Sequence, residues 1–377
     1  MSIVKTLLSP FRVIARTLRP TSVRQSLSRM PTVRHFVTVS CFVVVAIGVS
    51  AFIGSAANGL MAGGAAITIA VLGLSWLTGL SGQVSIGNSG FMAVGGYAAG
   101  IWAFHHAPPQ AFGQAFGPAE WSILIALALA LIFGALSGLI VGIPGTRLRG
   151  PYLAGFTLAF AVVLPQFIQT LSYTGGSGGL TSITPPQPPA WFVNFFSGDA
   201  AKLNSTAQWL TDFVVVIAGI TFFLMANLFN SKSGRAMRLV RDNDVAAELV
   251  GINLPRARTM AFVVSAALGG LSGGLSMYVS QGVTPGSFSL TLSISLLTVM
   301  VLGGIGTLSG AVIGGVIYAF SGNLVSRINS LTGIDPNSQW GINMKGILFG
   351  GVLIITMLLA PRGIVGLGSR MRSRIRS

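Results

Sequence analysis

The residues best suited to bind a polar partner are gathered in one segment, residues 230–258 (NSKSGRAMRLVRDNDVAAELVGINLPRAR). It contains three of the seven acids in the chain, Asp242, Asp244 and Glu248, together with six basic residues. The sequence on either side is apolar and is expected to form membrane-buried helices. A charged segment of this size between membrane helices offers a surface on which a soluble protein can dock.

The order of residues in this segment predicts two short helices joined by a turn. The segment Ser231–Ser233 offers capping groups for a first helix over GRAMRLVR, and the DND sequence at 242–244 can cap a second helix over VAAELV. Gly251 and then Pro255 end the second helix. A solvated connecting loop with incidental charges is the alternative interpretation.

The second of these helices has residues suited to contact. Val245 and Leu249 lie four positions apart and therefore share one helix face. Ala246 and Ala247 are small, which suits close approach to another surface. Glu248 is expected to stay in water.

The composition identifies an integral membrane protein. The 377 residues are 52% hydrophobic and 8% charged, whereas soluble globular proteins carry about 25% charged residues. No Arg, Lys, Asp or Glu occurs in 35–119, 151–198 or 259–326. Because about 20 apolar residues cross the hydrocarbon core, each stretch has room for more than one crossing. The 50 glycines suit close helix packing in a bilayer.

The apolar blocks predict an all-α, polytopic bundle of about eight to ten transmembrane helices with broken or re-entrant segments. Glycines after 302 leave open whether 289–325 forms two helices or one full helix and a broken one. The predicted crossings are 36–53, 60–78, 84–104, 121–143, 151–170, 208–229, 259–279, 289–302, 308–325 and 343–360.

Basic residues predict which helix ends face the cytoplasm. Seven basic residues and no acid precede position 35, and five basic residues and no acid follow position 361. By the positive-inside rule, both chain ends and 230–258 are expected in the cytoplasm, and 171–207 outside. The same rule explains the basic ends without a nucleic-acid partner. The predicted regions are a basic cytoplasmic arm (1–35), a transmembrane domain (36–360) and a basic cytoplasmic tail (361–377).

Two glycine-rich segments fall in different halves of the chain, 81–100 (SGQVSIGNSGFMAVGGYAAG) and 303–315 (GGIGTLSGAVIGG). Broken helices in both halves of a transporter often line the substrate path, and tight helix packing is the alternative. Neutral polar side chains at membrane depth are costly unless they meet protein or water. The first segment thus supplies candidates for a translocation pathway: Gln83, Ser85, Asn88 and Ser89.

Four segments together resemble one family, the LivM-type permeases of branched-chain amino-acid ABC importers. Val245-Ala246-Ala247 followed by Gly251 has the spacing of the EAA…G loop of bacterial importer permeases. The family often has an acid at the first of these positions; this chain has Val245 there, and Asp244 lies one place earlier. The four segments, in the family's order, are GLSGQVSIGNSGFMAVGGYAAG (79–100), RGPYLAGFTLAF (149–160), GRAMRLVRDNDVAAELVGINLPRARTMAFVVSAALGGLSGGL (234–275) and VLGGIGTLSGAVIGG (301–315).

The resemblance implies a permease subunit of an ABC importer for branched-chain or related amino acids in the bacterial cell (plasma or inner) membrane. Its implied partners are a second, LivH-like permease, two cytoplasmic ATPases and an extracytoplasmic solute-binding protein. The chain would be no enzyme and would bind no cofactor, because ATP is hydrolysed by the partner subunits. Thr157 joins the pathway candidates. The implied ATPase-coupling residues are Gly234, Arg235, Arg238, Asp242, Asp244, Val245, Ala246, Ala247 and Gly251.

Alternative functions predict partly different sequence features. An importer of urea or short amides would share much of this pattern. An ion-coupled secondary transporter would need membrane-buried ionisable groups, for which Lys345 is the candidate, although a snorkelling role is simpler. No GxxxxGK[ST] phosphate loop occurs in the sequence. His105 and His106 are expected in a solvated outer loop rather than a metal site, and Cys41, the only cysteine, is expected to pack between helices.

Overall fold

In the computed structural model the protein is almost entirely helical, with one two-residue antiparallel ladder between β1 and β2. This confirms the predicted all-α, polytopic architecture. Most of the predicted basic arm and tail lies outside the described residues. The structure describes residues 31–105, 119–148, 150–181, 183, 185, 201–333, 335, 338–359 and 363–364.

Every apolar block predicted from the sequence overlaps one long helix. The long helices are α4 (Pro31–Ser50), α5 (Ser55–Leu74), α6 (Asn88–His105), α7 (Ala119–Gly145), α8 (Pro151–Gln169), α10 (Ala201–Asn230), α13 (Leu254–Ser280), α14 (Leu290–Gly303), α15 (Leu308–Thr332) and α16 (Gln339–Leu359). The shorter elements are the π-helix η1 (Ser75–Leu80), α11 (Lys232–Asp242), α12 (Asp244–Leu249), the 3-10 turns η2 (Ser172–Thr174), η3 (Gly176–Gly178) and η4 (Pro285–Phe288), and the strands β1 (Leu180–Thr181) and β2 (Gly282–Val283).

Several of these helices can cross a bilayer, so the chain is a multi-pass membrane protein. Shorter apolar helices at His35–Ser50, Leu290–Gly303 and Asn343–Leu358 add to the long ones. At about 1.5 Å per residue, the 14-residue α14 is about 21 Å long, less than the hydrocarbon core of about 30 Å. The six stretches in the described chain that are long and apolar enough are Ser55–Leu80, Ser122–Gly145, Pro151–Gln169, Thr206–Asn230, Leu254–Ser280 and Leu308–Thr332.

Both glycine-rich segments contain a break in helical structure. The crossing predicted over 84–104 starts too early, because residues 81–87 are not helical and α6 begins at Asn88. In the late segment, α14 and α15 are two separate helices, of which α15 is long enough to cross the membrane and α14 is shorter than the hydrocarbon core. Gly304 and Gly306 between them have φ angles of 128° and 71°, a region that favours glycine.

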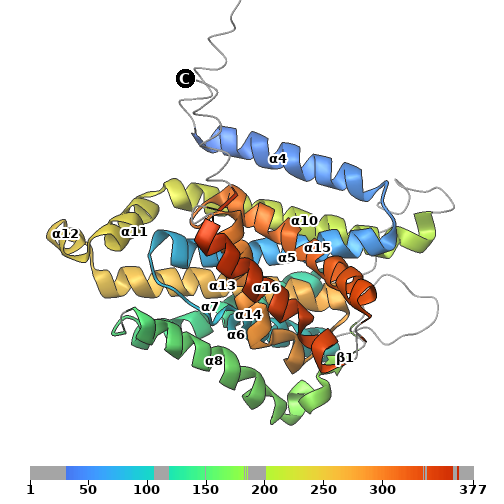
Figure 1. The fold of residues 1–377 in the computed structure, drawn as a ribbon. Coiled ribbons are helices and arrows are strands. Elements are labelled where there is room, and N and C mark those ends of the chain that lie inside the picture. Colours follow the sequence, from blue (N-terminus) through green and yellow to red (C-terminus); the bar gives the residue numbers. More distant parts are fainter. Residues whose placement is uncertain are drawn as a thin grey trace, which may run out of the picture.

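The centre of the bundle is α13, which packs against α5, α6 and α7 (Figure 1). Small residues make these contacts possible. Gly270 of α13 lies directly against Gly95 of α6 and Gly134 of α7, and a Cβ at any of the three would overlap backbone atoms. The abundance of glycine therefore serves close helix packing, as the sequence predicted.

Contacts at both ends of α4 fix its direction relative to α10. At the beginning of α4, His35 Nε2 lies 3.2 Å from Nδ2 of Asn230, the last residue of α10. At the other end, the Ser50 hydroxyl donates to the carboxylate of Asp212, early in α10. The first described residues of the chain therefore lie on the same side as α11 and α12, which follow α10.

The end of α16 lies on that side too. Gly363, just after α16, lies against Gly304, and the neighbouring Gly306 lies against Gly79 of η1, which contacts α11. The segment after α8 lies at the opposite end, because β1 pairs with β2 beyond the far end of α13. Figure 1 shows α12 and β1 at opposite ends of the bundle.

Candidate functional site

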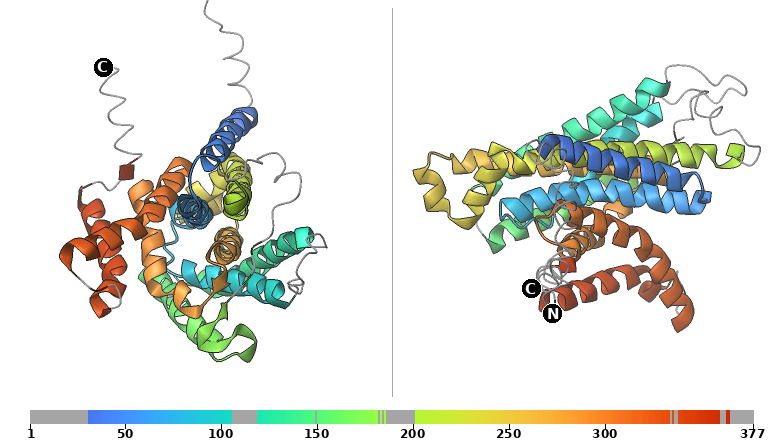
Figure 2. Two further views of the ribbon diagram at one scale, coloured as in Figure 1. Left: turned by 90° about the vertical axis from the view of Figure 1, so that its right-hand side faces the viewer. Right: turned by 90° about the horizontal axis from the view of Figure 1, so that it is seen from above.

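The segment 230–258 forms the predicted pair of short helices, which project from one end of the bundle (Figure 2). Their starts are capped as the sequence predicted. Ser231 and Asn243 each accept a hydrogen bond from a backbone N–H three residues later, at 3.3 Å and 3.1 Å. Asn253 caps α13 in the same way, at 3.0 Å. Because capping satisfies N–H groups that have no partner inside the helix, it fixes where α11, α12 and α13 begin.

Gly251 ends α12 as predicted. Its φ of 81° lies in the left-handed region, and its N–H donates to the carbonyl of Glu248 at 2.9 Å. The N–H of Ile252 donates to the carbonyl of Ala247 at 3.0 Å. These two bonds form a Schellman motif, which turns the chain sharply back toward α13.

Ala247, expected to approach another surface closely, contacts its own chain. Its side chain is fully buried and packs with Val240 of α11 and Leu254 of α13. Its small size therefore serves the internal packing of the segment: it lets α12 lie close to α11 and α13. The neighbouring Ala246 is half-buried.

The outer surface of α12 is apolar instead. Val245, Leu249 and Val250 are 65%, 84% and 67% exposed. The predicted common face of Val245 and Leu249 is thus open, and Glu248 beside it is exposed as expected. Three large apolar side chains at the tip of a projecting helix pair form a surface that a second protein can cover.

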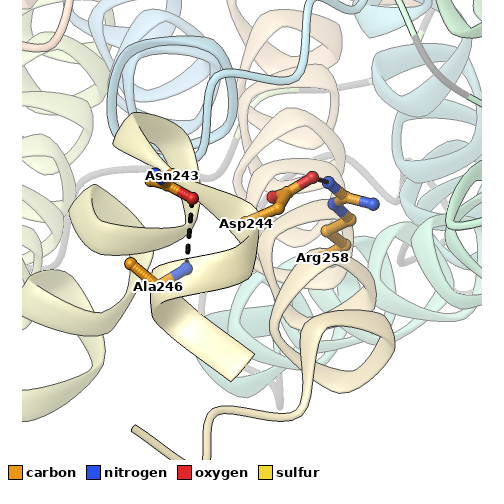
Figure 3. A network of polar contacts seen from close by, with 4 residues as sticks. All are labelled: Asn243, Asp244, Ala246 and Arg258. Atoms are coloured by element: carbon orange, nitrogen blue, oxygen red, sulfur yellow. Dashed lines mark hydrogen bonds and ion pairs between the residues drawn. The ribbon is translucent and has the colours of Figure 1, made fainter. Parts of the chain in front are cut away.

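An ion pair fixes α12 to the start of α13. The Arg258 guanidinium donates to Oδ2 of Asp244 at 2.6 Å (Figure 3). Figure 3 also shows the Asn243 cap beside this pair. The other acid of this turn, Asp242, is exposed.

Arg235 and Arg238, which we expected to serve coupling, hold α11 on the end of α10. Arg235 donates to the carbonyl of Asn230 and Arg238 to that of Phe229, both at 3.0 Å. Gly234 is buried where the chain turns, against the Phe229 carbonyl. These residues orient the projecting pair relative to the membrane helices.

The second group of candidates lies in and beside the non-helical segment 81–87. Three of the five candidate residues in this group have hydrogen-bond partners within the protein. Thr157 Oγ1 accepts from the N–H of Ile86 at 3.1 Å, and Ser85 Oγ accepts from the N–H of Gly87 at 3.3 Å. The Ser89 hydroxyl accepts from the Ser293 hydroxyl at 2.7 Å. These bonds hold the non-helical segment in place, which favours a structural role for Ser85, Ser89 and Thr157.

Gln83 and Asn88 differ from the other three. Their side chains are 7% and 1% exposed, and among the described residues neither amide group has a hydrogen-bond partner. A buried amide without a partner costs about 1–3 kcal/mol. An arrangement that costs free energy at two neighbouring positions is typical of a site that meets water or a solute.

Two residues in the described chain gain a role that the sequence did not suggest. Arg241, in the last turn of α11, donates to the carbonyl of Gly79 in η1. Asp212 is buried inside α10, with one carboxylate oxygen bonded to Ser50 and the other without a partner among the described residues. An acid in an apolar block is itself a signal for Asp212. Nothing in the sequence connects Arg241 with Gly79.

The remaining candidates lie apart from both groups. Lys345 is half-buried, with Nζ 3.1 Å from the Tyr318 hydroxyl and 4.2 Å from the centroid of its ring. His105 is exposed at the end of α6, and His106 lies outside the described residues. Cys41 is exposed on α4, so its predicted role in helix packing is wrong for this chain alone.

Comparison with known proteins agrees with the resemblance noted in the sequence. The sequence model of the family described as "Branched-chain amino acid transport system / permease component" matches residues 55–357. This range contains both groups of candidate residues and, among the long helices that the structure describes, all except α4 and the last residues of α16.

Individual relatives match over much of their length. The chain is 27% identical to the "High-affinity branched-chain amino acid transport system permease protein LivM" of Salmonella typhimurium over 308 residues, which is 78% of this chain and 66% of the relative. It is 26% identical to LivM of Escherichia coli over the same shares. A probable LivH permease of Methanocaldococcus jannaschii is 30% identical over 45% of this chain and 51% of its own length.

The chain thus spans about two thirds of the LivM relatives. No solved structure matches it. Since the family's sequence model covers most of the chain and includes both glycine-rich breaks and the projecting helix pair, the chain belongs to the family of branched-chain amino acid transport permease components.

Proposed function

We propose that this chain is a permease subunit of an ATP-driven importer that carries branched-chain amino acids across the cell membrane. Family membership supports the class of transport. The observation that carries the proposal is the exposed apolar surface of α12, formed by Val245, Leu249 and Val250. In the proposed importer an ATPase supplies the energy, and this projecting surface offers that partner a place to bind.

The proposed assembly has the parts that the family resemblance implies. Two cytoplasmic ATPases bind the projecting helices of this chain and of a second, LivH-like permease, and hydrolyse the ATP, so this chain binds no cofactor itself. A solute-binding protein delivers the amino acid on the outer side. Both chain ends and α11–α12 face the cytoplasm, and the segment after α8 faces outward. The positive-inside rule and the shared side of α4, α11 and Gly363 support this orientation.

Gln83 and Asn88 line the proposed pathway. Each amide carries an N–H₂ donor and a carbonyl acceptor. An amino acid carries an ammonium group and a carboxylate, so neutral amides can meet both ends without a fixed charge that would hold the solute too tightly. ATP-driven closure of the ATPases moves α11 and α12 and changes which side of the membrane these amides face.

The decisive experiment is uptake by the reconstituted complex. The chain is co-expressed with candidate partner subunits, purified and placed in vesicles with ATP inside, and uptake of radiolabelled leucine and urea is measured. ATP-dependent leucine uptake is the expected result. Urea uptake alone would favour an importer of short amides. Uptake driven by an ion gradient without ATP would contradict the proposal and direct attention to the buried carboxylate of Asp212.

A further inference from the structure

Arg241 connects the projecting helices to the membrane bundle. It lies in the last turn of α11, and its guanidinium donates to the carbonyl oxygen of Gly79 in η1. The two residues are 162 positions apart in the chain. The aliphatic part of the same side chain covers Gly82, where an added Cβ would lie 3.0 Å from Arg241 Cγ.

The other arginines of α11 do not make such a connection. Arg235 and Arg238 donate to carbonyls at the end of α10, five and nine positions away. Those bonds stay within one continuous part of the chain and move with it. The Arg241 bond joins α11 to a different part of the bundle, so any movement of α11 acts on η1 through it.

Gly79 lies two residues before the first glycine-rich segment and contacts the second one. It lies directly against Gly306, in the break between α14 and α15, and a Cβ on Gly79 would overlap the Gly306 backbone. Helix η1 ends one residue later, at Leu80. Carbonyls at a helix end lack helical partners and carry partial negative charge, which suits a cationic donor.

The non-helical segment that follows η1 is hydrogen-bonded to the same helix end. The N–H of Gln83 donates to the carbonyl of Leu77 at 3.3 Å, and the Thr78 hydroxyl donates to the carbonyl of Gln83 at 3.1 Å. A displacement at Gly79 therefore reaches the backbone of Gln83 through two hydrogen bonds. The far end of the segment is held separately by Thr157 of α8.

We propose that Arg241 is the positioning residue through which movement of α11 and α12 shifts residues 79–83 and so reorients the Gln83 amide. This inference rests on the proposed function, because it takes the projecting helices as the part that an ATPase moves. It adds a specific path from the ATPase contact to the polar residues of the membrane bundle. Neither the sequence motifs nor the family match assigns a role to Arg241.

The first test compares leucine uptake per ATP hydrolysed in the reconstituted complex. Arg241→Ala should lower this ratio about fivefold or more, the smallest effect expected of an allosteric link, while the ATPase still co-purifies. Arg241→Lys keeps a charged donor and should give a ratio between that of the unmodified complex and that of Arg241→Ala. Lys232→Ala removes another cation from α11 at an exposed position and should leave the ratio unchanged.

The second test reads the movement directly. In a Cys41→Ser background, a cysteine at Val84, which is 44% exposed, is labelled with a thiol reagent with and without ATP and vanadate. Trapping should change the labelling rate when Arg241 is present and leave it unchanged in Arg241→Ala. This readout needs no transported solute, so it tests Arg241 even if leucine proves to be the wrong solute.

Two results would overturn the inference. One is an Arg241→Ala complex that keeps both the uptake ratio and the response of Val84→Cys to trapping. The other is an Arg241→Ala chain that fails to assemble together with an Arg241→Lys chain that behaves like the unmodified complex, since Arg241 would then only hold the fold. Loss of ATP-driven uptake in the unmodified complex would instead count against the proposed function.

Discussion

Asp244 and Arg258 form an ion pair, with Oδ2 and Nη2 2.6 Å apart, that joins the first residue of α12 to the first turns of α13. Both side chains are partly exposed, so the pair contributes about 0.2–1 kcal/mol to stability. Its larger effect is to set the direction in which the apolar tip of α12 points. The pair is therefore expected to matter more for coupling than for folding.

Reversing the charge of one partner of this ion pair should weaken coupling, and exchanging the charges of both should restore it. We expect Arg258→Asp to reduce leucine uptake because two acids would repel each other at the start of α12. The double variant Asp244→Arg with Arg258→Asp should recover most of the lost uptake, and the melting temperature should change little in either. Uptake and thermal unfolding of the three complexes check this. A double variant no better than the single one would argue against orientation by this pair.

A charge on the apolar tip should release the ATPase. Leu249 is 84% exposed, so Leu249→Arg can be accommodated in the free chain but would place an unpaired charge in an apolar interface. Co-purification of the ATPase should be lost while the permease still inserts. Leu331, 86% exposed near the end of α15, supplies the control, because Leu331→Arg should leave the ATPase bound. Equal ATPase recovery with both variants would remove the tip from the docking surface.

The cost of replacing Gly251 at the end of α12 should come from backbone strain rather than from steric overlap. No atom lies within 4 Å of a Cβ at Gly251, so Gly251→Ala would cost only the left-handed strain of about 1–2 kcal/mol. Gly251→Asn should cost less, because asparagine tolerates this region. We expect faster proteolytic cleavage within 244–254 for the alanine variant than for the asparagine variant. Equal cleavage rates would mean that the Schellman turn does not limit local opening.

Most of the helices could be predicted from the sequence because their apolar blocks are about as long as a membrane crossing. The break over 81–87 could not, since the apolar block continues into α6 and the non-helical segment is held by a hydrogen bond from Ile86 to Thr157, which is 71 positions away. Ala247 was expected to approach another surface because it is small. Its burial results from Leu254, which only the turn at Gly251 brings back against it.

The proposed orientation predicts a simple labelling pattern. Ser177 in η3 and Ser233 in α11 are both exposed and lie at opposite ends of the bundle. In a Cys41→Ser background, Ser177→Cys should react with an impermeant thiol reagent in right-side-out vesicles, and Ser233→Cys should react only after the membrane is permeabilised. A third position suited to this test, Ser369 in the basic tail, lies outside the described residues. Labelling at position 233 in sealed vesicles would reverse the orientation.

The unpartnered amides of Gln83 and Asn88 predict opposite effects on stability and transport. Replacing either with leucine removes a buried polar group whose desolvation costs about 1–3 kcal/mol, so Gln83→Leu and Asn88→Leu should hold or raise the melting temperature. Both should reduce leucine uptake, because the pathway loses a donor and an acceptor for the zwitterion. Thr157→Val serves as the contrast: it removes the hydroxyl that accepts from Ile86 and should lower stability. Leucine variants that lose stability as the valine variant does, or that transport normally, would assign the amides to helix packing instead.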